Sequence, residues 1–277
     1  MIEWREVADG VFQRRYQPLD ISITLIQGSA GATLVDTRSS PAEAQEIVSD
    51  VARDFGLPVV AVINTHAHYD HTFGNQVFAA HPGVPIYGHH LVSKHFEMFE
   101  APRLRRQRQD PTREPDRDWA TVTLIPPTVP IARRTRITPA GREIELIPLP
   151  PGHTDTDLAV FIPDARVWIL GDIVEESAPP MFGSGCHPLG WPGVLAELLV
   201  EIEPGDKIIP GHGAVAGRDF VLAQHGHLRR TAAIIVDSWA KGLSIEQALA
   251  HGQEHFPWPV AVLESALKHG YAQLARR

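Results

Sequence analysis

The apolar run Val59-Val60-Ala61-Val62-Ile63 constrains the fold more than any other segment, because five consecutive apolar residues predict a strand buried on both faces. Further strands are predicted at residues 11–16, 21–27 and 32–36, and a helix that Pro41 opens and Gly56 ends follows them. A similar series recurs, with strands at 143–148, 158–162, 167–170 and 207–210 and a helix at 191–202. Two halves of similar design predict an α/β sandwich of two sheets with helices outside.

The charge balance and the start of the chain narrow the class of partner. The 277 residues include 25 Lys and Arg against 33 Asp and Glu, a formal net charge of -8 that opposes attraction to phosphate, so we expect no nucleic-acid partner. The acidic start, with Glu3 and Glu6, and the lack of about 18 uninterrupted apolar residues predict neither a secretory signal nor a membrane segment. We therefore expect a cytoplasmic protein that binds a small-molecule substrate and no membrane.

Two regions lie outside the regular series of strands and helices. Residues 101–139 are rich in proline and arginine and are predicted to form a partly helical excursion within a domain of residues 1–217. Its arginines at 103, 105, 106, 108, 113 and 117 could form a solvated helix face or a rim that attracts anions. Residues 218–277 are predicted to be a helical extension, with a capping box at Ser244 and Gln247 and a final helix after Pro259. This extension would pack on the sandwich or on a second subunit in a homodimer.

Histidine is the residue type that points to chemistry. The chain has 15 histidines but a single cysteine, Cys186, which excludes an intrachain disulfide and any zinc site that needs two thiolates. Three histidines and an aspartate fall within six residues directly after the buried strand, at His66, His68, Asp70 and His71. In an extended segment His66 and His68 project to the same side, so both can reach one metal ion.

Three further turns carry a potential ligand at the end of a predicted strand. They are Pro151-Gly152-His153-Thr154, Gly171-Asp172 and Pro210-Gly211-His212-Gly213. Each alone is typical of an ordinary turn. Four strand ends that all carry His or Asp indicate a shared site, because the loops at one edge of a sheet are where functional groups converge.

The order of these motifs resembles that of the metallo-β-lactamase superfamily, over about residues 5 to 220. The resemblance rests on HAHYDH at 66–71, PGHT at 151–154, GD at 171–172 and PGHG at 210–213. It implies a four-layer αβ/βα sandwich, here with extra C-terminal helices. It also implies that His66, His68 and His153 hold one metal ion, that Asp70, His71 and His212 hold a second, and that Asp172 bridges the two.

The expected cofactor is two zinc ions, although iron or manganese would also suit nitrogen and oxygen ligands. Two such cations lower the pKa of a bridging water towards about 7 and polarise the oxygen under attack. The sequence thus predicts a metal-dependent hydrolase that uses a metal-bridging hydroxide against a small carbonyl substrate: an ester, lactone, lactam or thioester. Asp70 is predicted both to bind metal and to orient the hydroxide.

Other functions stay open at this stage. The same ligands could hold a single iron in an enzyme similar to the sulfur dioxygenases of the family. A binding protein without turnover is disfavoured, because nothing would then keep the unpaired ligand groups together. Weak, promiscuous β-lactamase activity is a further alternative. Efficient activity is not expected, because Glu175 stands where related zinc lactamases carry a lysine for the substrate carboxylate.

Several residues near the motifs are assigned lesser roles. Met181, Phe182 and Trp191 are predicted to form an apolar wall for the substrate, and Tyr69 to line the pocket. Cys186 lies on a glycine-rich loop and is predicted to be a mobile loop thiol. The three histidines that follow Tyr87-Gly88 are predicted to lie on a helix in surface or structural roles; they are His89, His90 and His95.

Overall fold

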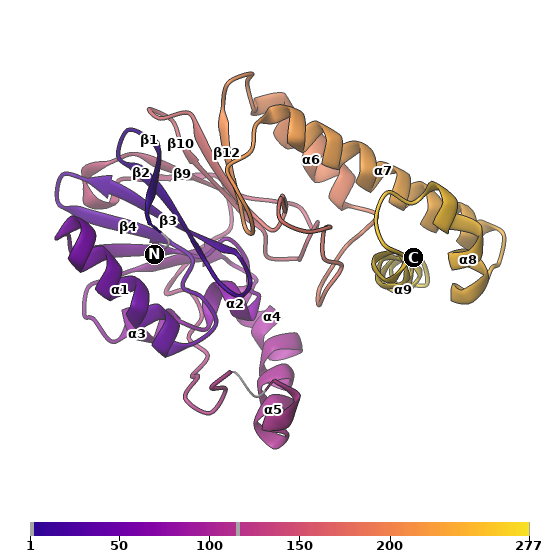
Figure 1. The fold of residues 1–277 in the computed structure, drawn as a ribbon, viewed down its shortest axis with the longest axis horizontal. Helices are drawn as coiled ribbons and strands as arrows, with labels where there is room; N and C mark the ends of the chain where they lie inside the picture. Colours follow the sequence, from indigo (N-terminus) through magenta and orange to yellow (C-terminus); the bar gives the residue numbers. More distant parts are fainter. Residues whose placement is uncertain (1–2, 115–116, 277) are drawn as a thin grey trace.

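The computed structural model describes residues 3–114 and 117–276. Residues 115 and 116, within the predicted excursion, and residue 277, at the end of the predicted extension, lie outside the described residues, as do residues 1 and 2. Two β-sheets lie face to face and helices cover both outer faces (Figure 1). The predicted α/β sandwich is confirmed.

The first sheet of the described chain has seven strands in chain order. They are β1 (Arg5–Ala8), β2 (Val11–Tyr16), β3 (Ile21–Gly28), β4 (Gly31–Val35), β5 (Val59–Ile63), β6 (Ile86–His89) and β7 (Val129–Ile131). β1 to β4 pair antiparallel, whereas β4 to β7 pair parallel. Parallel neighbours need a crossover, and α1 (Pro41–Phe55) supplies it between β4 and β5.

Helix α1 has the boundaries that its sequence predicts. The Ser40 side chain accepts a hydrogen bond from the Glu43 N–H at 3.2 Å, and Pro41 follows at the first helical position. Gly56 ends the helix with φ 64°, a left-handed conformation that glycine adopts without strain.

The second sheet described has five strands in the spatial order β12-β11-β10-β9-β8. They are β8 (Thr135–Ile137), β9 (Ile144–Pro148), β10 (Leu158–Ile162), β11 (Val167–Gly171) and β12 (Lys207–Pro210). β11 and β12 pair parallel, with α6 (Trp191–Glu201) in the crossover between them, and the other neighbours pair antiparallel. This arrangement brings the carboxyl ends of β11 and β12 to the same edge.

Three apolar layers hold the sandwich together. Between the sheets, Val35 and Ile63 pack in one cluster with Val160 and Ile169. On the outer face of the first sheet, Ile47 of α1 belongs to a second cluster. A third cluster covers the outer face of the second sheet. It includes Trp168, Leu170, Leu195, Leu198 and Ile208. Burial on both faces explains the continuous apolar run at β5.

Between β5 and β8 the chain forms short helices and the predicted excursion. The elements are α2 (Tyr69–Thr72), α3 (Asn75–Ala79), α4 (Val92–His95), a π-helical turn at Phe96–Glu100, and α5 (Ala101–Gln109), with a 3-10 turn at Pro111–Arg113. α5 projects from the sandwich (Figure 1). His89 ends β6 and His90 lies in the turn that follows, so the predicted helical position is wrong for both, whereas His95 lies on α4.

The last part of the chain is helical, as predicted. α7 (Arg218–Ala240), α8 (Ile245–Gly252) and α9 (Val260–Leu274) extend away from the sheets (Figure 1). The capping box of Ser244 and Gln247 is present at the start of α8. Leu228 of α7 and Leu267 of α9 belong to the same cluster as α6, so the extension packs on the sandwich of its own chain. The predicted homodimer and the domain boundary at 217 stay predictions. No described helix combines the length and apolar character that crossing a membrane requires.

Candidate metal centre

The predicted ligand residues meet at one edge of the sandwich, where strands of both sheets end. His66, His68, Asp70 and His71 follow β5 of the first sheet. His153 follows β9, Asp172 follows β11, and His212 follows β12 of the second sheet. All seven side chains are buried, although the motifs lie up to 146 positions apart in the numbering from 66 to 212.

A first group consists of His66, His68, His153 and Asp172. His153 Nε2 lies 3.0 Å from His68 Nδ1, and Asp172 Oδ2 lies 3.5 Å from His153 Nε2 and 3.7 Å from His66 Nε2. Four ligand atoms so close together are the number and type that a tetrahedral zinc site uses.

A second group consists of Asp70, His71 and His212, and it also faces Asp172. Asp172 Oδ1 lies 3.1 Å from His71 Nε2 and 3.5 Å from His212 Nε2. Asp70 Oδ2 lies 3.4 Å from His212 Nε2. The two oxygens of Asp172 therefore face different groups, which is the position that a bridging ligand needs.

Hydrogen bonds on the far side of three histidines fix which nitrogen faces the centre. His68 Nε2 donates to the Ser184 carbonyl at 3.0 Å, and His212 Nδ1 donates to the Leu19 carbonyl at 2.8 Å. His71 Nδ1 lies 2.7 Å from Asp36 Oδ2. A ring nitrogen that donates to an oxygen leaves the lone pair of the other nitrogen for a metal, and it holds the ring in place.

Two aspartates that sequence reasoning missed support these loops. Asp36 accepts hydrogen bonds from the Thr65 N–H at 2.8 Å and the Thr65 hydroxyl at 2.7 Å, besides its contact with His71. Asp157 accepts from the N–H and hydroxyl of Thr154, at 2.9 and 2.7 Å, and so holds the turn that carries His153. Asp36 directly follows β4, the neighbour of β5 in the first sheet. An aspartate at the end of a strand is the same pattern that identified the predicted ligands, so the sequence could have pointed to Asp36.

Replacing Asp36 with alanine is expected to lower metal affinity about 10- to 100-fold, because the orientation of His71 would no longer be fixed. The measurement is a competition titration against a chromophoric chelator. Asp50→Ala is the matched control: Asp50 is buried and bonds the Tyr16 hydroxyl at 2.8 Å, outside the centre. That control is expected to lose stability but to keep metal affinity. Equal affinities for both variants would contradict the role of Asp36.

The electrostatics of the two groups suit divalent cations. Burial lowers the pKa of His68 to about 4 and of His153 to about 3, so both rings are neutral, as metal ligands must be. Burial opposes the ionisation of Asp70, but without a bound cation protonated His71 and His212 outweigh the effect of burial and lower the pKa of Asp70 to about 2. A bound cation would take over this role once both rings serve as neutral ligands. Among the described residues, His66 Nε2 and Asp172 Oδ1 are buried without a hydrogen bond. Cations would satisfy these atoms, so the residues fit a metal pair.

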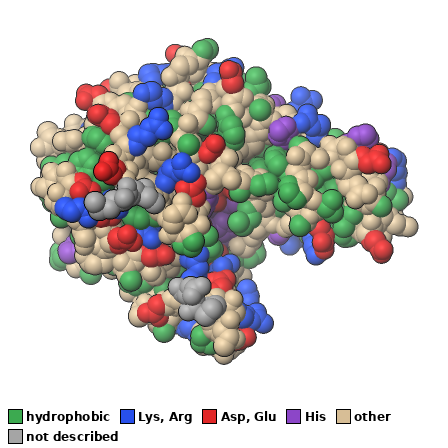
Figure 2. Space-filling model, in the orientation of Figure 1, with side chains coloured by type: hydrophobic (Ala, Val, Ile, Leu, Met, Phe, Trp, Pro, Cys, Tyr) green, Lys and Arg blue, Asp and Glu red, His purple; other side chains and the backbone are tan. Residues whose placement is uncertain are grey.

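A cavity of about 710 Å³ opens onto the centre. His68, Asp70, Asp172 and His212 form part of its lining, and the remaining lining includes Pro18, Leu19, Asp20, Tyr69, Glu100, Arg103, Glu175, Met181 and Ser184. Figure 2 shows histidine surface in the hollow between the sandwich, α5 and the C-terminal helices. The predicted lining residues Tyr69 and Met181 therefore do border the space in front of the centre.

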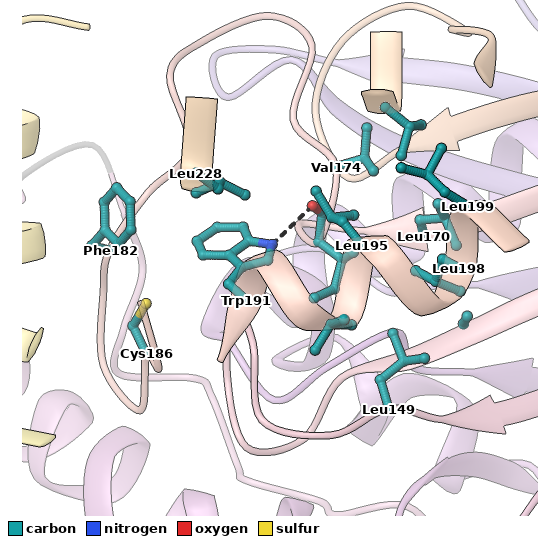
Figure 3. Packing of buried hydrophobic residues seen from close by; sticks show 14 of the residues in the cluster. Leu149, Leu170, Val174, Phe182, Cys186, Trp191, Leu195, Leu198, Leu199 and Leu228 are labelled. Carbon is teal, nitrogen blue, oxygen red and sulfur yellow. Dashed lines mark hydrogen bonds between the residues drawn. The ribbon is translucent and has the colours of Figure 1, made fainter. Parts of the chain in front are cut away.

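The structure does not support the predicted substrate wall at Phe182 and Trp191. Phe182 is 3% exposed and Trp191 is 0% exposed, and both belong to the core cluster of α6 (Figure 3). The Trp191 indole N–H donates to the Ile173 carbonyl at 3.1 Å, and its ring lies 5.5 Å from that of Phe182. Both rings are large apolar surfaces that packing removes from water, whereas the neighbouring Met181 stays 60% exposed.

Two further residues, Cys186 and Glu175, differ from what the sequence predicts. Cys186 is buried in this core cluster and not a mobile loop thiol, and burial raises the pKa of its thiol well above the usual range (Figure 3). Glu175 is buried too, and its Oε1 accepts from the Met181 N–H at 3.1 Å. Burial and the nearby Asp172 raise the pKa of Glu175 well above its usual range, which favours a neutral carboxyl. The expected repulsion of an anionic substrate by Glu175 is therefore weaker than its formal charge indicates.

His95 lies next to His68, a member of the first group. Its Nδ1 lies 2.6 Å from Asp155 Oδ1, and its ring lies 5.7 Å from the ring of His68. His95 also forms a third group of potential metal ligands with His68 and Glu100, so the structural role that the sequence indicated stays a prediction. His89 and His90 lie side by side, with ring centroids 4.5 Å apart, and neither belongs to any of the three groups of potential ligands found among the described residues.

Comparison with known proteins decides the family. A family model described as the metallo-beta-lactamase superfamily matches residues 16–219, which include all seven predicted ligands. The chain belongs to this superfamily. Its four-layer sandwich is the fold that the motif resemblance implied.

Two relatives of this metallo-β-lactamase superfamily member are named as hydrolases. The chain is 24% identical over 244 residues to the probable metallo-hydrolase YflN of Bacillus subtilis (strain 168), covering 78% of this chain and 88% of the relative. It is 26% identical over 176 residues to a hydroxyacylglutathione hydrolase of Synechococcus sp. (strain JA-3-3Ab), covering 63% of this chain and 53% of that protein. These relatives support a metal-binding hydrolase.

Solved structures show the same fold. A metallo-beta-lactamase from Pontibacter korlensis superposes with a TM-score of 0.67 at 17% identity, covering 83% of this chain and 99% of that one. The sec-alkylsulfatase Pisa1 from Pseudomonas sp. superposes with a TM-score of 0.75 at 20% identity, covering 99% of this chain and 50% of that one. The second match therefore includes the C-terminal helices of this superfamily member.

Proposed function

We propose that this protein is a dinuclear zinc hydrolase that attacks a small carbonyl substrate: an ester, lactone, lactam or thioester. One observation carries the proposal. Two groups of ligand side chains share Asp172 and border one cavity. In this assignment His66, His68 and His153 would hold one ion, Asp70, His71 and His212 would hold the other, and Asp172 would be a ligand of both. Zinc suits this set of imidazole and carboxylate ligands.

The reaction needs a nucleophile at neutral pH and a polarised substrate. Bound divalent ions supply both, because they lower the pKa of water towards about 7 and withdraw electrons from the substrate oxygen. Asp70 lines the cavity and its Oδ2 lies 3.4 Å from His212 Nε2, so this carboxylate can accept a hydrogen bond from water and orient it. The name of the relative hydroxyacylglutathione hydrolase supports an acyl substrate.

The chain's own residues also arrange access. Pro18, Leu19 and Met181 give part of the cavity an apolar lining, which suits the uncharged portion of a small substrate. Tyr69 borders the same space next to Asp70. We place the substrate there, with its carbonyl group at the metal-ligand end of the cavity and its remainder along this lining.

The experiment is metal analysis of protein purified without added metal or chelator, together with hydrolysis assays on ester, lactone, lactam and thioester substrates. We expect two zinc ions per chain. Removal of metal by a chelator is expected to reduce turnover at least about 100-fold, and added zinc to restore it. One iron per chain with no hydrolysis would instead favour an oxygen-dependent iron enzyme. Turnover that survives complete metal removal would refute the proposal.

A further inference from the structure

We propose that the substrate carries an anionic oxygen group apart from the bond that is cleaved, and that Arg103 of α5 binds this group. The inference rests on the proposed hydrolase and specifies its substrate class. Arg103 borders the cavity together with Tyr69, Asp70 and His212. It belongs to the arginine-rich excursion, for which the sequence left a solvated face and an anion-attracting rim as alternatives.

Aromatic rings hold the Arg103 guanidinium in place. Its Cζ lies 4.0 Å from the centre of the Tyr69 ring and 5.7 Å from that of Trp119. Tyr69 in turn packs edge to face against Trp119, with centroids 5.5 Å apart. A guanidinium stacked on a ring keeps the donors along its edge available, and the stacking reduces the entropy lost when a ligand binds.

The guanidinium also has donors to spare. Its Nη2 donates to Glu114 Oε1 at 3.4 Å, a long contact between partly exposed groups. Within residues 3–114 and 117–276, Arg103 Nε is buried and has no hydrogen-bond partner. The side chain is 29% exposed, so ligands can reach it from the cavity. A carboxylate matches the planar fork of an arginine, and the accessible N–H groups of the guanidinium would donate charge-assisted hydrogen bonds to it.

Three aspartates that line the cavity face partners other than Arg103. Asp70 Oδ2 lies 3.4 Å from His212 Nε2, and Asp172 Oδ1 lies 3.1 Å from His71 Nε2. Asp20 is paired with Arg15, whose Nε donates to Asp20 Oδ1 at 2.8 Å. Arg103 is thus the arginine of the described lining, and the carboxylate that it contacts, Glu114 at 3.4 Å, lies outside that lining.

Other arginines of the excursion behave differently. Arg105 and Arg106 lie exposed on α5 and do not border the cavity. Arg108 donates to the Trp119 carbonyl at 3.0 Å and so fixes the following loop. The solvated interpretation therefore applies to Arg105 and Arg106, and the anion-binding interpretation applies to Arg103.

The test compares two esters of equal chain length on the zinc-loaded protein: 4-nitrophenyl hexanoate, which is neutral, and mono-4-nitrophenyl adipate, which ends in a carboxylate. Arg103→Gln is expected to raise KM for the adipate ester about 10- to 100-fold and to change the hexanoate reaction less than about twofold. Arg106→Gln, an exposed substitution on the same helix, is the control and is expected to change neither. Equal effects of Arg103→Gln on both esters, or none on the adipate ester, would overturn the proposal.

Two additions keep this test independent of turnover and of folding. Calorimetry compares the binding of adipate and hexanoate to wild type and Arg103→Gln, and we expect the preference for adipate to disappear in the variant. If adipate binds preferentially but no ester is hydrolysed, the hydrolase fails while the anion site stands. Arg103→Lys keeps the positive charge but loses the planar guanidinium, and we expect its KM for the adipate ester to lie between those of wild type and Arg103→Gln. If the KM of the Lys variant equals that of Arg103→Gln at an unchanged melting temperature, the planar guanidinium is needed in addition to the charge. The 4-nitrophenyl ester of 6-sulfohexanoate shows whether the site also binds a sulfonate. If Arg103→Gln raises KM for this ester as much as for the adipate ester, the site binds sulfonates as well as carboxylates. If KM for this ester is unchanged, the site is specific for carboxylates.

Discussion

Replacing Asp172 with alanine is expected to reduce turnover more than about 100-fold and to lower metal content at both sites together. The loss of an outer hydrogen-bond partner alone typically costs about 10- to 100-fold, and Asp172 contacts both ligand groups directly. Asp172 is 4% exposed, and its carboxylate faces His66 and His153 with one oxygen, and His71 and His212 with the other. Elemental analysis and assays on the same preparation would measure both effects.

Asp164→Ala is the control for this experiment, because Asp164 lies exposed in the turn between β10 and β11 and pairs only with Arg142 in the described salt bridges. It is expected to retain metal and turnover. A variant of Asp172 that loses metal from one site and keeps the other would show that the carboxylate does not bridge. Full metal content with full turnover would contradict its assignment as a ligand.

The second large effect concerns stability. Trp191→Ala is expected to lower the free energy of unfolding by about 3–5 kcal/mol, because the ring is fully buried and its removal leaves a cavity in the α6 cluster. The hydrogen bond from its indole to the Ile173 carbonyl is lost as well (Figure 3). Urea unfolding of the metal-free protein would measure the change without the contribution of bound metal.

Met181→Ala is the matched comparison on the same loop. Its side chain is exposed and borders the cavity, so we expect a stability change within about 0.5 kcal/mol and a changed KM. If Trp191→Ala instead changed KM and left the free energy of unfolding unchanged, Trp191 would contact the substrate, as the sequence predicted.

Local patterns predicted the parts of the fold that local interactions decide. The ends of α1 are predictable because the residues that begin and end the helix are Ser40, Pro41 and Gly56, each typical of its position. The apolar run at β5 is predictable because it needs burial on both faces in any α/β arrangement. The motif at residues 66–71 was equally visible, because four potential ligands lie within one short segment.

Other features depend on which way a segment turns after the sheets have packed. Met181, Phe182 and Trp191 are all apolar, and composition does not distinguish a cavity wall from a core. Arg103 and Arg106 lie one turn apart on α5, and only the placement of that helix against Tyr69 separates their environments. Asp36 differs from both cases, because its position after β4 was readable from the sequence.

The division of the ligands between the two sheets has a consequence for how the protein matures. Residues 66–71 leave the ribosome first and bring four of the seven predicted ligands, while His153, Asp172 and His212 follow on the second sheet. Because domains gain their contacts as the chain is synthesised, an incomplete chain offers only one side of the centre. The predicted ligands therefore come together only once the second sheet has docked on the first, so that metal affinity is expected to depend on a folded sandwich.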